Sequence, residues 1–356
     1  MPNEHAVIER PTRPPSNPPA ASGRRARLLA AGLPVALLLL ALAVWASLFV
    51  GSGSVGAGDV VHALLHGDAA NRGQLVVREV RMPRTAAGLL AGTALGLAGT
   101  VMQGVTRNPL ADPGLLGVNA GASVSVVFAM SVLGLTAPSQ YIWFGFLGAT
   151  VAAALVYGVG SMGREGATPL KLALSGAAVG SALTSLTTSI LLGDSDTFEQ
   201  YRFWQVGSLA GREAPVLWQA LPFVAAGTVF ALLLGPGLNT LALGDDLARG
   251  LGQRVGRARL GAAACVVLLC GSATVVAGPI GFVGLVIPHA VRLFTGPDHR
   301  WLLPYSALLA PVLVLLADVV GRVVARPGEV QVGIVTAAVG ALPFILLVRY
   351  RKAVEL

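Results

Sequence analysis

Charged residues are scarce in this chain. Asp, Glu, Lys and Arg make up 12% of its 356 residues, whereas a soluble globular domain carries about 25%. The sequence is therefore not that of an ordinary water-covered domain. Lysine occurs only at Lys171 and Lys352. The phosphate-binding loop of nucleotide hydrolases requires the pattern G-x-x-x-x-G-K-[ST]. Because neither lysine lies in it, we expect the chain itself to be no ATP-hydrolysing enzyme of this kind.

Cysteine and histidine are scarce too. The two cysteines, Cys265 and Cys270, stand five residues apart, which places them on different faces of a helix and favours neither a disulfide nor a metal site. Among the five histidines only His62 and His66 are four residues apart, without the acid of an H-E-x-x-H zinc motif. We expect no catalytic residue, metal or directly bound cofactor.

Long apolar runs fill most of the chain, and 54% of the residues are hydrophobic. About 20 apolar residues suffice for a helix to span a membrane. We predict an all-α polytopic membrane protein in which residues 28–352 form a single transmembrane domain. The ten predicted spans are 28–50, 84–104, 115–134, 141–160, 169–192, 216–235, 259–278, 280–295, 302–323 and 331–349.

The cationic residues set the predicted orientation. With the N-terminus inside, 17 of the 25 Lys and Arg residues fall on the inner side and eight on the outer side, so both termini are expected in the cytoplasm of a bacterium, with the chain in its cytoplasmic membrane. Residues 1–27, rich in Pro and Arg, are expected to be a disordered cytoplasmic tail. The net charge of +8 does not indicate nucleic-acid binding, because the arginines are dispersed among loops.

A faint internal repeat links the two halves. The segments "GTALGLAG" at 92–99 and "GSATVVAG" at 271–278 share the pattern G-[TS]-A-x-x-x-A-G, and the same offset places Pro109 on Pro288. Both units begin and end on matching sides of the membrane, so we predict two parallel repeats, which are known among transporters.

Few polar groups lie within the predicted spans. Asp318 stands one helical turn from Arg322, which favours a helix-end ion pair, with a transport-gating role as the alternative. Gln103 and Asn108 close the second span beside Pro109. These amides, with Pro288 and Asp318, either face a transport pathway or hold neighbouring helices and broken backbone together. The sequence leaves both possibilities open.

A charged segment at 238–256 interrupts the apolar runs. On a helix, Leu243, Leu247, Leu251 and Val255 form one stripe. Asp245 and Asp246 precede Arg249, the favourable order for the helix dipole. Glycines at 250 and 252 predict two short helices or one kinked helix. The orientation places this segment in the cytoplasm, between spans six and seven. It could lie on lipid, pack on the chain's own helix ends, or enter a groove of a partner.

At this segment the sequence resembles a known family. "LGDDLARGLG" is similar to the coupling helices of the permease subunits of ABC importers for ferric siderophores, haem and cobalamin. Residues 77–123 carry the family's R-x-P-R and Q-x(4)-N-P-L-A-x-P-x-x-L-G, as "RMPR" and "QGVTRNPLADPGLLG". "GPIGFVGLVIPHAVRLFTGPDHRWLLP" and "LADVVGR…EVQVGIVTAAVG" resemble its C-terminal half. Two positions near the last span depart from the family pattern: Gln331, after Glu329 and Val330, stands where proline is usual, and Pro343 is displaced by one.

The resemblance implies an assembly. A second permease subunit, identical or related, would share the pathway within the lipid. Two separate ATPases, which use ATP and Mg, would dock on Leu243, Asp245, Asp246, Leu247, Arg249 and Leu251. An extracytoplasmic substrate-binding protein would contact Arg81 and Arg322. The function implied is the permease of an iron–siderophore importer. Haem or cobalamin as substrate, and an ion-coupled secondary transporter, are the alternatives.

Overall fold

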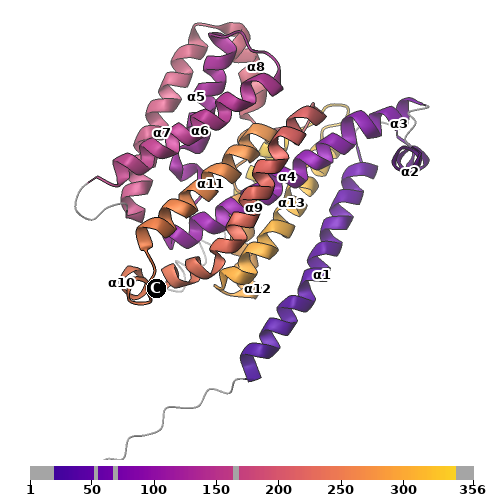
Figure 1. Cartoon of the computed structure of the whole chain (residues 1–356). Coiled ribbons are helices and arrows are strands. Elements are labelled where there is room, and N and C mark those ends of the chain that lie inside the picture. Colours follow the sequence, from indigo (N-terminus) through magenta and orange to yellow (C-terminus); the bar gives the residue numbers. More distant parts are fainter. Residues whose placement is uncertain (1–19, 52–54, 67–70, 163–167, 342–356) are drawn as a thin grey trace, which may run out of the picture.

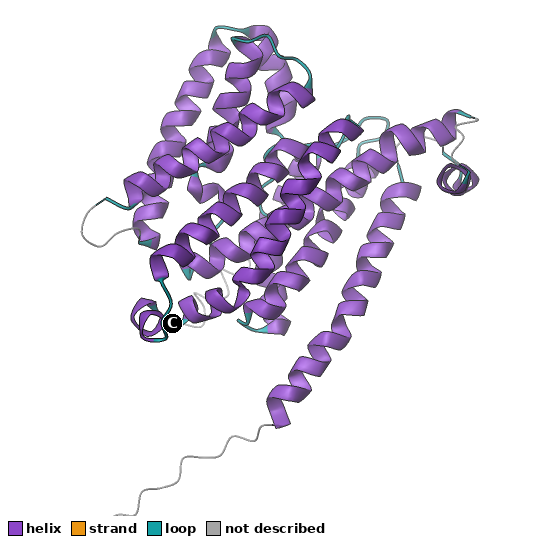
Figure 2. Cartoon of the chain, viewed as in Figure 1, coloured by secondary structure: helices purple, strands orange, loops and turns teal. Residues whose placement is uncertain are grey.

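The structure, a computed structural model, describes residues 20–51, 55–66, 71–162 and 168–341. This part of the chain contains helices and connecting loops and no strand (Figure 2). The all-α prediction is thus confirmed. The predicted N-terminal tail falls mostly outside the described residues, but helix α1 already begins at Ala20, eight residues before the predicted first span.

Within the described residues, ten apolar helices correspond in order to the ten predicted spans. Seven are long and apolar enough to cross a membrane and three are shorter. The long ones are α1 (Ala20–Phe49), α4 (Met82–Thr106), α6 (Pro138–Gly160), α7 (Pro169–Leu192), α9 (Ala214–Ala242), α11 (Val255–Ala277) and α13 (His299–Val324). The shorter ones are α5 (Val118–Ser131), α12 (Val283–Thr295) and Val332–Ala341. The end of the last predicted span, from residue 342, lies outside the described residues.

Several short helices were not predicted. Helix α2 (Ala57–Leu65) follows α1, and α3 (Arg72–Val76) continues through a π-helical stretch, Val77–Arg81, into α4. The second span therefore belongs to a helix that begins at Arg72, twelve residues before the predicted start. Helix α8 (Ser195–Gln205) follows α7. Helix α10 (Asp245–Gly250) lies in the charged segment, where short helices were expected.

Helix α4 lies at the centre of the fold and is mostly buried. It packs against α13, α11, α9 and α12 (Figure 1). The close approach depends on its small residues: a Cβ at Gly99 would collide with the backbone of Gly284 at the start of α12. Small residues allow such backbone contact between membrane helices. The segment 92–99, noted in the sequence as part of a repeat, thus forms the central packing face.

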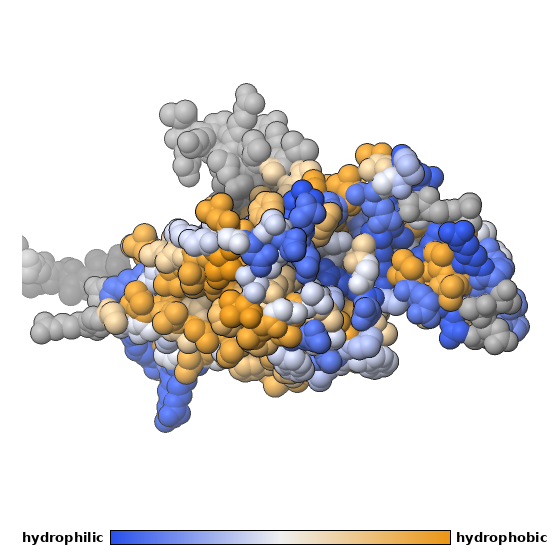
Figure 3. Space-filling view, turned by 90° about the horizontal axis from the view of Figure 1, so that it is seen from above, coloured by the Kyte–Doolittle hydropathy of each residue, from blue (hydrophilic) through white to orange (hydrophobic). Residues whose placement is uncertain are grey.

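The remaining helices flank this centre. Helices α5, α6, α7 and α8 form a group on one side, and α1 runs along the other side (Figure 1). Helix α10 lies at one end of α4 and α11, whereas α2 and α3 lie at the opposite end. Seen from above, hydrophobic side chains cover much of the left and centre of the molecule, as expected for helices in lipid (Figure 3).

Helix α1 is the most peripheral span, since only a small share of it is buried. It packs mainly on α13. Near its N-terminal end, the Tyr305 hydroxyl donates to the Leu29 carbonyl at 2.7 Å, and Arg25 donates to the Thr295 carbonyl at 3.1 Å. Polar bonds at its end thus supplement a limited packing surface.

Candidate functional site

Three leucines project from the segment 238–256. Leu243, Leu247 and Leu251 are each more than half exposed, and we call them the leucine ridge. The predicted fourth member, Val255, is buried and begins α11. The prediction of a four-residue stripe was wrong there because Gly252, at φ +83°, turns the chain between the two helices. The ridge is therefore short and points away from the helices behind it.

Asp245 and Asp246 have different surroundings. Asp245 is paired at 3.0 Å with Arg259 of α11 and at 3.1 Å with Arg107, which ends α4. Asp246 is fully exposed and pairs only with Arg249 of its own helix, at 2.9 Å, among the described residues. Asp245 therefore ties α10 to two central spans, whereas Asp246 belongs to the surface.

Arginines cap the C-terminal end of α1. The last carbonyls of a helix lack intrahelical donors, and a cation beside them is favoured by the helix dipole. Arg322 donates to the Ser47 carbonyl at 3.0 Å, Arg81 to Leu48 at 2.7 Å and Arg326 to Gly51 at 2.7 Å. Three of the eight arginines expected outside thus have a structural use.

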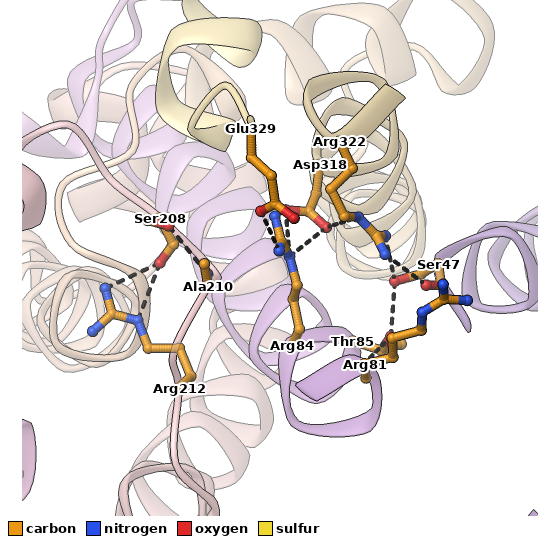
Figure 4. A network of polar contacts seen from close by, with 10 residues as sticks. All are labelled: Ser47, Arg81, Arg84, Thr85, Ser208, Ala210, Arg212, Asp318, Arg322 and Glu329. Atoms are coloured by element: carbon orange, nitrogen blue, oxygen red, sulfur yellow. Dashed lines mark hydrogen bonds and ion pairs between the residues drawn. The ribbon is translucent and has the colours of Figure 1, made fainter. Parts of the chain in front are cut away.

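A buried ion-pair network lies beside this cap (Figure 4). The Asp318 carboxylate, with 1% of its side chain exposed, lies 2.8 Å from Arg84 and 3.1 Å from Arg322. Arg84 also contacts Glu329 at 2.6 Å. The predicted pairing of Asp318 with Arg322 is confirmed, but the sequence did not indicate Arg84 as a partner. The R-x-P-R motif, which contains Arg84, was the available signal.

Arg81 and Arg322 are both buried, with 4% and 2% of their surface exposed. Their predicted contact with a binding protein stays a prediction. In this conformation their guanidinium groups are occupied by the carbonyls of α1 and by Asp318. The exposed Arg326 lies beside them.

Gln103 joins α4 to α12. Its amide nitrogen donates to the carbonyls of Gly284 and Leu285 at 3.3 Å each, and its oxygen accepts from Arg292 at 3.4 Å. In a regular α-helix the Gly284 carbonyl would accept from residue 288, but Pro288 has no N–H. The Gln103 amide thus donates to the Gly284 carbonyl the hydrogen bond that Pro288 cannot donate. Of the two possibilities for Gln103, the geometry favours holding the helices together.

Asn108 and Pro109 form the break after α4. Arg107 ends the helix in the left-handed conformation, at φ 52°. The Asn108 side chain is exposed and accepts from the Leu110 N–H at 2.9 Å, a local turn that satisfies backbone. Asp112 then accepts from the Gly114 N–H at 2.8 Å, where a short helix (η2, Pro113–Leu116) begins. The segment satisfies its own backbone, as a broken helix in a membrane protein requires.

A cavity of about 560 Å³ with a mixed polar and apolar lining opens between α5, α7 and α8. Its polar lining consists of hydroxyl and amide side chains, and no charged residue is among the described residues that line it: Asn119, Ser123, Thr184, Thr187, Thr188, Tyr201 and Gln205. Sequence reasoning missed this cavity. The signal was the run "SALTSLTTS" within α7, whose hydroxyl residues recur at helical spacing. We call this feature the hydroxyl cavity.

The hydroxyl groups on α7 are partly satisfied within their own helix. Thr184 donates to the Gly180 carbonyl at 2.8 Å, and Thr188 donates to Thr184 at 3.0 Å. Opposite them, the Asn119 side-chain oxygen accepts from Thr274 at 3.0 Å. The hydroxyl oxygens retain the ability to accept further hydrogen bonds. The cavity is thus suited to contact a polar molecule without a fixed charge.

Comparison with known proteins gives a consistent result. The chain is 46% identical, over 92% of its length and 98% of the relative's, to the ferric enterobactin transport system permease protein FepD of Escherichia coli. It is 40% identical, over 88% and 94%, to the probable siderophore transport system permease protein YfiZ of Bacillus subtilis. It is 38% identical, over 78% and 74%, to the cobalamin import system permease protein BtuC of Halobacterium salinarum.

A solved structure agrees with these relatives. A metal-chelate type ABC transporter in an inward-facing conformation superposes with a TM-score of 0.78 at 27% identity, covering 90% of this chain and 99% of that one. Residues 38–350 match the model of the FecCD transport family. The chain belongs to the FecCD transport family and is one of its membrane-spanning permeases.

Proposed function

We propose that this chain forms the membrane pathway of an ATP-driven importer for a ferric siderophore, together with a second permease subunit. The names of the relatives support this substrate class, since the two relatives with the highest identities given above are permeases for ferric enterobactin and a siderophore. Haem and cobalamin are the competing substrates. ATP and Mg are used by separate ATPase subunits, because neither lysine of the chain lies in a phosphate-binding loop.

The leucine ridge carries the proposal. Exposed apolar side chains on and beside a short helix at the cytoplasmic end suit insertion into a groove of a partner. Asp245 connects this helix to the end of α4 and the start of α11. When the ATPases close, they push on α10, and the push reaches both central spans through these ion pairs. The spans tilt, and the pathway alternates between outward and inward openings.

The hydroxyl cavity is proposed as part of the pathway wall. It lies on α7, which is only slightly buried in the single chain, so a second subunit facing α7 would enclose it. Hydroxyl and amide groups hydrogen-bond an oxygen-rich chelate. Conduction requires binding weak enough for release, and a wall without charged side chains keeps these contacts weak. Asn119 and Thr187 are the positions that we expect to face substrate.

An extracytoplasmic binding protein is proposed to deliver the substrate at the outer end. Direct contact of its carboxylates with Arg81 and Arg322 would require the two guanidinium groups to leave the carbonyls of Leu48 and Ser47. Exposed ion pairs contribute about 0–1 kcal/mol each, so their main effect would be on orientation and encounter rate.

ATP hydrolysis in nanodiscs tests the proposal. The chain is reconstituted alone and with ATPase subunits encoded beside it, and hydrolysis is measured with binding proteins loaded with ferric siderophore, haem or cobalamin. We expect activity only in the complex, raised most by the siderophore-loaded protein. A larger response to haem or cobalamin would change the substrate. Uptake that survives ATP depletion and collapses with the proton gradient would indicate a secondary transporter.

A matched pair of variants isolates the ridge. Leu247→Ala removes its central side chain and is expected to weaken ATPase association by tenfold or more, about 1.4 kcal/mol. Leu170→Ala changes an equally exposed leucine at the start of α7, outside the ridge, and is expected to leave association unchanged. Equal association of both variants would contradict the docking role.

A further inference from the structure

An apolar groove of about 400 Å³ runs between α4 and α9 at their outer ends. Its floor and walls are formed by side chains at helical spacing on the two helices: Met82, Pro83, Ala86, Leu89 and Leu90 on one, and Ala214, Leu217, Trp218 and Leu221 on the other. Both helices are long and apolar enough to cross a membrane. The groove therefore lies along the direction in which lipid acyl chains run.

Arg78 lies at the outer end of this groove. It is exposed and lines the groove one turn before Met82. Among the described residues no hydrogen bond or ion pair involves its guanidinium group. It differs in this from Arg81 and Arg84, which lie on the same continuous helix and are buried with partners. A guanidinium group forms strong, often bidentate, hydrogen bonds with phosphate.

Trp218 marks the membrane interface at the same level. Its side chain is 71% exposed and lies in the second turn of α9, beside the groove. Tryptophan is enriched where the hydrocarbon region meets the lipid headgroups. Arg78 and Trp218 thus place the outer end of the groove at headgroup depth, with apolar residues below it. From Arg78 to Leu90 the helix advances about 18 Å.

We propose that this groove holds an anionic phospholipid of the outer leaflet, with its phosphate on Arg78 and one acyl chain between α4 and α9. The charge at one end and the apolar lining along the rest match the two parts of such a lipid. A helix of a partner protein would match the apolar part alone unless it also carried a carboxylate at the level of Arg78. The bound lipid fills the groove between the two helices.

Native mass spectrometry of the full chain tests the proposal. The probes are dioleoyl phosphatidylglycerol and dioleoyl phosphatidylcholine, which share their acyl chains and differ in net charge. We expect the wild-type chain to retain one phosphatidylglycerol with at least fivefold higher occupancy than phosphatidylcholine. Arg78→Gln is expected to abolish this preference, so that the variant retains the two lipids equally.

Two further variants separate the headgroup from the acyl chain. Ala86→Phe fills the groove and leaves Arg78 in place, so it is expected to reduce retention of both lipids. If Ala86→Phe does not fold, Trp218→Ala, a substitution at an exposed position of the groove, is used in its place. Arg202→Gln removes an exposed arginine of α8, outside the groove, and is expected to change nothing.

The outcomes decide the proposal in either direction. Equal phosphatidylglycerol retention in Arg78→Gln and Arg202→Gln overturns it. Lower phosphatidylglycerol retention in Arg78→Gln, together with unchanged retention in both groove variants, would show a headgroup contact without an acyl-chain site. That result also overturns the proposal. A change in oligomer mass in the groove variants, with lipid retention unaltered, assigns the groove to a second copy of the chain instead.

Discussion

Arg84 of α4 and Asp318 of α13 lie 2.8 Å apart in the protein interior, although 234 residues separate them in the sequence. Asp318 is also paired with Arg322 of its own helix, at 3.1 Å. One carboxylate thus compensates two guanidinium groups. An unpaired carboxylate in a membrane span costs up to about 2.5–3.5 kcal/mol on insertion scales, the value at the centre of the span. Pairing across two helices explains why the sequence tolerates Asp318 within an apolar run.

Replacing this carboxylate should strongly destabilise the fold. Asp318→Asn leaves Arg84 and Arg322 buried without their shared anion, and breaking a buried pair in this way costs about 3–5 kcal/mol. Asp196→Asn changes an exposed aspartate at the start of α8 and should stay within about 0.5 kcal/mol. Thermal unfolding in detergent, followed by size-exclusion chromatography, compares the two. Similar melting temperatures would show that the network contributes little to stability.

Asp245 and Asp246 should respond differently to the same substitution. A hydrogen bond to a charged group contributes about 1.5–3 kcal/mol, and because Asp245 is 24% exposed we expect the lower end for Asp245→Asn. The amides of α10 should then exchange hydrogen faster by about tenfold. Asp246→Asn removes only a surface pair and should leave exchange unchanged.

The two variants also separate docking from coupling. In complex with its ATPases, Asp245→Asn should retain association while less substrate is transported for each ATP hydrolysed, because the ridge is intact and its link to α4 and α11 is lost. Asp246→Asn should leave the amount of substrate transported for each ATP unchanged, because Asp246 has no ion pair with α4 or α11 among the described residues. Identical transport ratios for the two variants would contradict the proposed transmission through Asp245.

The sequence predicted what periodicity and local chemistry determine. Ten spans follow from apolar runs, and the short helix near Asp245 follows from its glycines and charges. The pairing of Arg84 with Asp318 depends on which helices become neighbours, and no local pattern carries that information. The hydroxyl cavity was missed for a related reason. Threonines in a span also bond their own helix, so only the positions of α5 and α8 show that Thr187 lines a cavity.

Helix α8, which covers this cavity, should lose stability in acid. Asp194 caps α8, accepting from the Thr197 hydroxyl at 2.7 Å and from its N–H at 3.0 Å. These hydrogen bonds lower the pKa of Asp194 below its usual value of 3.8, and the bond from the Thr197 hydroxyl has the largest effect. A lowered pKa means that the capping contribution is fully present above the usual value and is lost as the pH falls through the lowered one.

Hydrogen exchange at acidic pH measures this loss. After correction for intrinsic rates, the α8 amides should stay protected down to about the usual aspartate pKa and lose protection below it. Asp194→Asn keeps an oxygen that can cap the helix but does not titrate in this range, so its protection should be independent of pH there. The same acid-induced loss in this variant would assign the effect to another group.

Gln103 and Pro288 should be energetically coupled. Gln103→Leu removes the donor to the Gly284 carbonyl, and leaving a buried acceptor unsatisfied costs about 1–3 kcal/mol. Pro288→Ala restores a backbone N–H at the position that can bond this carbonyl within α12. Gln103→Leu should therefore cost at least 1 kcal/mol less in the Pro288→Ala background than in the wild type. This difference is roughly the contribution of one such hydrogen bond. A double-mutant cycle on unfolding free energies measures the difference. Additive effects would show that Gln103 does not replace the hydrogen bond that Pro288 withholds, and would reopen the alternative that its amide faces the transport pathway.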